Sequence, residues 1–165
     1  MASAPEIYKA NLDAVSAGIL TGDFRLIVQH IGIPILMATG SREVVVSSVE
    51  EMEILITEYR QQLIEKGLVE YRRTCLWAEF QKPLPDMIMG EHRTEIRSAT
   101  GLIVPPYHCR LALMRIDGQW KAIWEHAHIV EDDVEFLATD IAKAQARAHA
   151  ALTERLRAQQ SNSES

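Results

Sequence analysis

The sequence predicts an α+β fold in which helices come first, antiparallel strands follow and one more helix ends the chain. Three observations predict this order. Apolar residues recur at helical spacing behind helix-capping signals at Ser3 and Ser48. Polar and apolar residues alternate along segments 68–80 and 87–98, as they do in half-buried strands. Asp117-Gly118 separates two strand-like runs, and this dipeptide favours a type I′ turn, which joins antiparallel strands.

Two helices are predicted in the first thirty residues. Ser3 and Glu6 fit a capping box, in which each side chain bonds the backbone N–H of the other residue. The first helix is expected to end near Gly22, and Asp23 can cap a second, short helix that runs through Gln29. The apolar face of the first helix consists of Tyr8, Leu12, Val15 and Ile19.

A short strand pair and a third helix are predicted next. Segments 33–38 and 42–46 have β-like composition, and Thr39-Gly40 supplies the bend between them. The second capping signal begins at Ser48, and Gly67 stops the helix behind it. One face of this helix carries Met52, Leu55, Ile56, Tyr59 and Leu63.

The alternation assigns faces more clearly in one long strand than in the other. In segment 87–98 the charged positions belong outside, so His92 is expected on the covered face. In segment 68–80 two alternate sets compete for the covered side, and the sequence does not choose between them. These sets are Tyr71, Cys75 and Trp77 against Thr74, Leu76, Ala78 and Phe80.

The hairpin at 107–128 is the clearest signal in the chain. Side chains alternate between the two faces of a strand, so the turn fixes which residues of the hairpin share a face. One of the two faces is mostly apolar, and we expect it to be the concave, covered one. The opposite face carries a cross-strand ion pair of Arg110 with Glu125, so Glu125 is expected to be structural. The pairs on the apolar face are Arg115 with Trp120, Leu113 with Ala122, Leu111 with Trp124, Cys109 with His126, and Tyr107 with His128.

Length and composition predict one domain over residues 1–131, followed by two further segments. The chain has 165 residues and is 47% hydrophobic, which suffices for one core. Segment 132–158, capped by Asp132, is predicted to form a helix with a narrow apolar stripe that packs on the domain or on a dimer partner. Segment 159–165 has the composition of a disordered tail.

The charge and the termini limit the classes of partner. A net charge of −6 without a basic patch argues against nucleic acid and anionic membranes as partners. The chain shows neither a signal peptide nor a run of about 20 apolar residues, so a cytoplasmic protein is expected. Cys75 and Cys109 lack metal or redox spacing and are expected to be reduced, packed thiols.

Three motifs stand within this order of elements: Asp117-Gly118-Gln119-Trp120-Lys121, the 24–40 segment with its central Pro34, and Ser48-Val49-Glu50-Glu51. Over about residues 6–130 the chain resembles the nuclear transport factor 2-like superfamily, in its SnoaL-like branch. The resemblance implies a cone-shaped, cystatin-like α+β fold, in which a curved antiparallel β-sheet wraps around the N-terminal helices and leaves an apolar pocket. It also implies a homodimer built on the outer face of the sheet. The extra C-terminal helix departs from the family pattern, and no catalytic set of the family transfers residue by residue.

Candidate chemistry centres on the histidines of the predicted covered face. His126 and His92 are the favoured bases for proton transfer, and Tyr107 is the candidate oxyanion donor. The same histidines, with His128, could hold zinc, but no carboxylate or fourth ligand is evident, so neither a metal nor another cofactor is predicted. The residues expected to line a ligand pocket are Trp124, His128, Cys109, Leu111, Trp77 and Tyr71.

Two functions follow from these features. The first is a protein that binds a small, mostly apolar molecule, with cofactor-independent acid/base chemistry of the isomerase, cyclase or dehydratase type. The alternative is a non-catalytic homodimeric binding or assembly module, in which Trp77, Trp120 and Trp124 fill the pocket. Of the doublet Arg72-Arg73, one guanidinium could reach a carboxylate-bearing ligand, although a solvated or interfacial charge is the commoner role.

Overall fold

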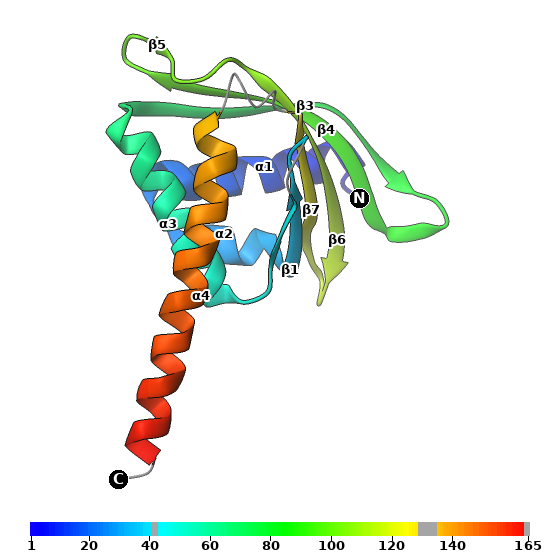
Figure 1. The fold of residues 1–165 in the computed structure, drawn as a ribbon. Helices are drawn as coiled ribbons and strands as arrows, with labels where there is room; N and C mark the ends of the chain where they lie inside the picture. The colour runs from blue at the N-terminus through cyan, green and yellow to red at the C-terminus, as the bar shows by residue number, and fades with distance from the viewer. Residues whose placement is uncertain (41–42, 129–134, 164–165) are drawn as a thin grey trace.

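The computed structural model describes residues 1–40, 43–128 and 135–163, and it shows helices packed inside a curved sheet (Figure 1). The helices are α1 (Ala4–Thr21), α2 (Phe24–His30), α3 (Val49–Glu65) and α4 (Glu135–Ser163). The strands are β1 (Ile31–Ala38), β2 (Glu43–Val46), β3 (Leu68–Gln81), β4 (Leu84–Ser98), β5 (Gly101–Leu102), β6 (Tyr107–Ile116) and β7 (Gln119–His128). The predicted α+β fold is confirmed.

The sheet has the strand order β2-β1-β7-β6-β4-β3, with the short β5 paired to β4. All pairs are antiparallel except β1 with β7, which run parallel, so the sheet is mixed rather than purely antiparallel. These two strands are distant in sequence, and no turn between them fixes their relative direction. The long strands β3 and β4 bend over the helices in Figure 1, which gives the sheet its concave face.

The helix ends follow the capping chemistry predicted for them. The Ser3 backbone N–H donates to the Glu6 carboxylate over 2.7 Å, and the Glu6 N–H donates back to the Ser3 hydroxyl. Gly22 ends α1 with a φ of 80°, a left-handed conformation that a glycine adopts without steric cost. At α3, the Ser48 hydroxyl accepts from the Glu51 N–H over 3.1 Å. Local sequence therefore determines where these two helices begin.

The helix α1 is fixed across the concave face by one buried side chain in particular. The ring of Tyr8 is fully buried and crosses β4 at Gly90, where an added Cβ would lie 2.4 Å from Tyr8 Cε2. The Tyr8 hydroxyl hydrogen-bonds His92 Nδ1 over 2.7 Å, two residues further along β4. His92 is also fully buried, so the prediction that it faces inward is confirmed. Only a glycine at position 90 lets the helix approach this closely.

The hairpin between β6 and β7 contains a β-bulge that the sequence did not predict. Asp117 and Gly118 have φ values of 51° and 79°, as a type I′ turn requires, and the predicted pairing holds as far as Leu113 with Ala122. Beyond that point Ala112 pairs with Trp124, so Ile123 is the extra residue. One extra residue exchanges the two faces of a strand, and the inward and outward sets of β7 are therefore reversed after residue 123.

This bulge overturns several predicted pairs. Leu111 lies opposite Glu125, Cys109 opposite Ala127, and His108 opposite His128. The predicted pairs of Leu111 with Trp124, Cys109 with His126, and Tyr107 with His128 are thus wrong. The predicted ion pair of Arg110 with Glu125 is wrong too, because the Arg110 guanidinium lies 4.0 Å from Glu91 instead. All these pairs fail for one physical reason: the alternation along β7 is interrupted at Ile123.

A second bulge explains why the sequence did not assign the faces of β3. Cys75 pairs with His92 and Trp77 with Glu91, so Leu76 is the extra residue. Tyr71 and Cys75 belong to the covered side before the bulge, whereas Ala78 belongs to it afterwards. Each of the two competing sets therefore supplies part of the covered face.

The helix α4 packs along α3 and then extends beyond the rest of the fold (Figure 1). Arg147 of α4 contacts the Glu58 carboxylate of α3 as an ion pair. The helix continues to Ser163, so it includes most of the segment that was predicted to be a disordered tail. The predicted cap, Asp132, lies outside the described residues. None of the described helices is long and apolar enough to cross a membrane.

The close approach of α1 to β4 gives a stability prediction. Gly90→Ala should lower the free energy of unfolding by about 1–3 kcal/mol, because the new methyl group would overlap the buried Tyr8 ring. Urea unfolding of both proteins measures this difference. Arg93→Ala, on the exposed face of the same strand, is the control and should cost less than about 1 kcal/mol. Equal effects of the two substitutions would contradict the packing described here.

Candidate functional site

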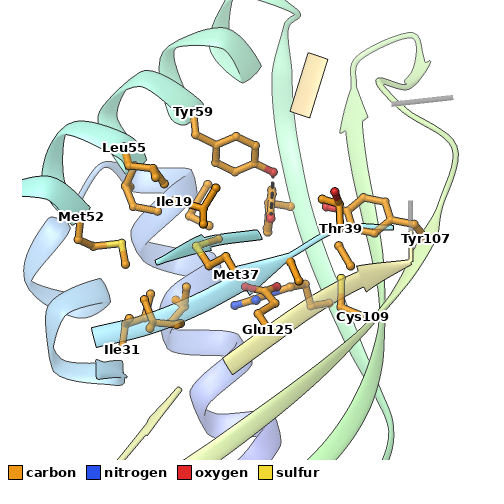
Figure 2. Close-up of a pocket in the computed structure, with 18 residues that line it drawn as sticks. Ile19, Ile31, Met37, Thr39, Met52, Leu55, Tyr59, Tyr107, Cys109 and Glu125 are labelled. Atoms are coloured by element: carbon orange, nitrogen blue, oxygen red, sulfur yellow. Dashed lines mark hydrogen bonds between the residues drawn. The ribbon is translucent and has the colours of Figure 1, made fainter. Parts of the chain in front are cut away.

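A cavity of about 100 Å³ lies between the helices α1 and α3 and the concave face of the sheet (Figure 2). Its helix side and the adjoining strand β1 are apolar, which makes this part of the wall suited to hydrocarbon groups. Aliphatic residues of this wall include Val15, Ile19, Ile35, Met52, Leu55 and Ile56. The tryptophans are absent from the lining, so the predicted filling of the pocket by Trp77, Trp120 and Trp124 is wrong.

Polar side chains gather at the sheet end of the cavity. Tyr71 and Arg73 come from β3, Tyr107 and Cys109 from β6, and Glu125 from β7. Figure 2 shows Glu125 and Cys109 on neighbouring strands, with Tyr107 and Thr39 at the same end. The Thr39 hydroxyl is buried without a hydrogen-bond partner among the described residues. A buried hydroxyl without a partner is costly and is best satisfied by a ligand or a water molecule.

Three tyrosine hydroxyls in this region remain neutral hydrogen-bonding groups. The hydroxyl oxygens of Tyr59 and Tyr71 lie 3.2 Å apart, and Tyr107 is near enough to influence the pKa of Tyr59. Burial is the main cause that raises the pKa of all three phenols, because it disfavours their charged form. They can therefore donate or accept hydrogen bonds to a ligand without contributing negative charge.

Glu125 is the carboxyl group of the cavity. Burial raises its pKa, and the nearby Arg73 cation opposes this shift only in part. Among the described side chains Glu125 forms no ion pair with Arg73. A carboxyl group with a raised pKa keeps its proton to a higher pH than an ordinary glutamate does, which suits it to act as a proton donor or acceptor.

Arg73 is the cation of the cavity, and the helix α1 holds it in place. Its Nε donates to the Ser16 hydroxyl over 2.9 Å, and its Nη2 donates to the Leu12 carbonyl over 3.1 Å. The guanidinium carbon also lies 6.0 Å from the centre of the Tyr71 ring. Both hydrogen-bond acceptors are neutral, so the charge of Arg73 remains available to a ligand.

His92 lies behind the cavity wall and not on its surface. Burial, with smaller contributions from the Arg73 and His108 charges, lowers the pKa of His92 to about 2. Its Nδ1 bonds the Tyr8 hydroxyl, whereas its Nε2 is buried without a partner among the described residues. The imidazole is therefore neutral at any physiological pH, and Tyr8 fixes the orientation of its ring.

Three of these groups could in principle hold a metal ion. A ring nitrogen of His92, the Cys109 sulfur and a Glu125 carboxylate oxygen lie within 4.8 Å of one another. A divalent ion there would have to displace the protons of Cys109 and Glu125, since burial raises both pKa values. It would also be repelled by Arg73, whose charge shifts the pKa values of all three groups in the direction expected of a near cation. The local field favours an anion at this end of the cavity.

The structure separates the residues predicted as site residues into three groups. Tyr71, Tyr107 and Cys109 line the cavity. Leu111 and His92 are buried in the core beneath it. The predicted inward orientation is wrong for four residues, which lie on the outer face because of the bulges in β3 and β7. These four are Trp77, Trp124, His126 and His128.

On the outer face these four residues make contacts of their own. The His126 and His128 rings lie 4.6 Å apart, and Trp124 packs edge-on against His126. The Trp77 indole N–H donates to the Glu91 carboxylate over 2.9 Å. Arg73 and Glu125 are charged residues of the described lining. The sequence left open which of Arg72 and Arg73 could reach a ligand, and it placed Glu125 in a structural ion pair on the other face. Arg73 could have been found once Tyr71 was placed inside, but nothing in the sequence marks the bulge that brings Glu125 inward.

Solved structures with the same fold are known. A nuclear transport factor 2-like protein of unknown function from Shewanella oneidensis is 14% identical, with 74% of this chain and 96% of that chain covered and a TM-score of 0.57. A protein of unknown function from Mycobacterium tuberculosis is 16% identical, with coverages of 87% and 85% and a TM-score of 0.55. A cystatin-like protein from Nostoc punctiforme is 10% identical, with coverages of 75% and 89% and a TM-score of 0.56.

These likenesses show that the chain has the nuclear transport factor 2-like, cystatin-like fold. The predicted cone-shaped fold is thereby confirmed. No protein-family model matches the chain, and no curated protein matches it in sequence. At such low identities the likeness concerns the fold, so the function has to be argued from the cavity itself.

The raised pKa of Glu125 gives a prediction about stability and pH. The folded protein holds the Glu125 proton more tightly than the unfolded chain does. The free energy of unfolding should therefore fall as the pH rises from the ordinary glutamate pKa of 4.5 through the pKa of Glu125 in the folded protein. Glu125→Gln removes this loss. The variant should melt at a higher temperature than wild type at mildly alkaline pH, and the difference should shrink below pH 4.5. Glu91→Gln, on the outer face, is the control. A Glu125→Gln variant that melts lower at every pH would contradict the assignment.

The lowered pKa of His92 gives a prediction of the opposite sign. Unfolding exposes an imidazole that takes up a proton below its ordinary pKa of 6.5, whereas the folded state does not do so until about 2. Wild type should therefore lose stability as the pH falls below 6.5, and His92→Gln should show a flatter dependence relative to its own stability at neutral pH. His108→Gln, with an exposed side chain, should keep the slope of wild type. Urea unfolding at a series of pH values compares them, and parallel slopes in all three would refute this role of His92.

Proposed function

We propose that the cavity binds a small, mostly apolar molecule and directs its one polar group toward Arg73, Glu125 and the tyrosines. The observation that carries this proposal is the separation of an aliphatic wall from a polar end within one cavity. A cavity of about 100 Å³ suits a small molecule with one short hydrocarbon group and one functional group. The resemblance of the sequence to the SnoaL-like branch, which implies an apolar pocket, also supports the binding of a small, mostly apolar molecule.

The chemistry that these groups support is proton transfer without a cofactor. Glu125 is the proposed proton donor or acceptor, in place of His126 on the outer face and His92 behind the wall. Tyr107 keeps its proposed role as a donor to developing oxyanion charge, together with Tyr71, because both phenols stay protonated. An isomerase, cyclase or dehydratase reaction would use such a set. Binding without turnover needs only the same contacts.

A homodimeric assembly module is the second candidate function, and the outer face of the sheet favours it. Trp77 and Met114 are 36% and 37% exposed there, which is a large apolar contribution to one surface. Aromatic and Met side chains are enriched at the centres of interfaces between proteins. This face could pair two copies of the chain while each cavity remains separate. The cytoplasmic location stays a prediction, and so does the lack of a nucleic-acid partner, which was inferred from the net charge.

Blocking the cavity tests the proposed function. Ala127 lines the cavity on β7, so Ala127→Phe should fill most of its volume. The probes are isovaleramide, isoamyl alcohol and isovalerate, which share one branched hydrocarbon group. At least one should bind wild type in calorimetry, and Ala127→Phe should lower its affinity at least about tenfold, a loss of about 1.4 kcal/mol.

His126→Phe is the matched control, because it adds a ring to the outer face of the same strand and should leave binding unchanged. Native mass spectrometry of the freshly purified protein reports the subunit number and any retained molecule together. Failure of all three probes to bind, or equal binding by wild type and Ala127→Phe, would contradict the proposal.

A further inference from the structure

Arg73 places a charge without a described counterion inside the cavity. Its two hydrogen bonds go to neutral acceptors, the Ser16 hydroxyl and the Leu12 carbonyl. A guanidinium has five N–H donors, so most of its donor capacity is not used by these bonds. Among the described side chains Arg73 forms no ion pair. By contrast its neighbour Arg72, which points to the other face, pairs with Glu70 over 2.5 Å.

The other groups at this end of the cavity do not neutralise Arg73. Glu125 on β7 is the one carboxyl group among the described lining residues, and burial shifts its titration toward the neutral form. Burial likewise keeps the phenols of α3, β3 and β6 and the thiol of β6 protonated, while His92 behind them is neutral. Arg73 is therefore the described group of the polar end whose charge does not change with pH.

The buried charge of Arg73 favours a ligand with a negatively charged group over a neutral ligand. An Arg-to-carboxylate contact in a site of low dielectric is shorter and stronger than a neutral hydrogen bond, and the planar guanidinium suits two-point binding of a carboxylate. A protonated Glu125 can donate a hydrogen bond to the same anion. This hydrogen bond is stronger to an anion than to a neutral ligand. The Thr39 hydroxyl at this end, which has no hydrogen-bond partner among the described residues, is a further donor.

We propose that the ligand of the cavity is a small apolar carboxylic acid, bound as its anion, with the carboxylate on Arg73 and the hydrocarbon part against the aliphatic wall. This inference rests on the proposed function, because it names the class of ligand for the same cavity. When its carboxyl group is protonated, Glu125 can donate a hydrogen bond to the bound anion. Ionisation of Glu125 would place a second negative charge beside the ligand, so binding weakens as the pH rises through the titration of Glu125.

A pair of matched ligands separates charge from shape. Isovalerate and isovaleramide have nearly the same size and differ in the charge of the head group. Calorimetry on wild type near neutral pH should show that isovalerate binds at least about tenfold more tightly than isovaleramide, which corresponds to about 1.4 kcal/mol. Equal affinities, or a preference for the amide, would overturn the inference and leave the proposed function intact. Failure of both ligands to bind would count against the proposed function itself.

Three variants test whether the preference comes from the guanidinium of Arg73. Arg73→Met should abolish the preference for isovalerate while isovaleramide still binds. Arg72→Met removes the same charge one residue away, on the opposite face of the sheet, and should keep the preference of wild type. Arg73→Lys keeps the charge but not the planar fork, so it should retain part of the preference. A preference that survives in Arg73→Met would refute the role of Arg73.

The pH dependence provides a test that does not depend on how well the Arg73 variants fold. Isovalerate should bind wild type more weakly as the pH rises through the titration of Glu125, measured over the pH range in which isovalerate itself is ionised. Glu125→Gln cannot ionise and offers an N–H donor in place of the carboxyl hydrogen, so its affinity for isovalerate should stay constant over the same range. Identical pH profiles in the two proteins would overturn the proposed part of Glu125.

Discussion

The bulge at Ile123 is the constraint on which the candidate site depends. A strand alternates its side chains strictly, so one inserted residue decides which half of β7 faces the helices. With the bulge, Glu125 and Ala127 line the cavity, whereas His126 and His128 face outward. Without it, two imidazoles would replace the carboxyl group, and the polar end would have a different charge and a different chemistry.

Burial then determines what the inward groups can do. The helices α1 and α3 exclude solvent from the polar end, which raises the pKa values of Glu125, the phenols and the Cys109 thiol. Arg73 is the exception, because a guanidinium keeps its charge and α1 supplies it with hydrogen bonds. A fixed positive charge beside the described hydrogen-bond donors is an arrangement suited to recognising one anionic group.

Features that depend on neighbouring residues were predicted well from the sequence. Features of the site that depend on contacts between distant residues were predicted poorly. The capping residues Ser3 and Ser48 and the Asp117-Gly118 turn depend on neighbouring residues, so their outcome could be derived from sequence. The bulges at Leu76 and Ile123 leave no such local mark, and every face assigned by counting past Ile123 was reversed. Hence the alternation along β6 put Tyr107 and Cys109 on the cavity side, the face of Tyr71 was left open, and the inward position of Glu125 could not be foreseen. The parallel pairing of β1 with β7 likewise depends on contacts between distant segments.

The position of the Glu125 carboxyl group is the central claim, and carbon-13 NMR of the labelled glutamate side chains tests it most directly. Comparison with the spectrum of Glu125→Gln identifies the resonance. In the structure described here this carboxyl group is inside the cavity, so it should titrate clearly above the ordinary glutamate pKa of 4.5. Titration at or below 4.5 would mean that Glu125 faces solvent, and the site described here would then be wrong.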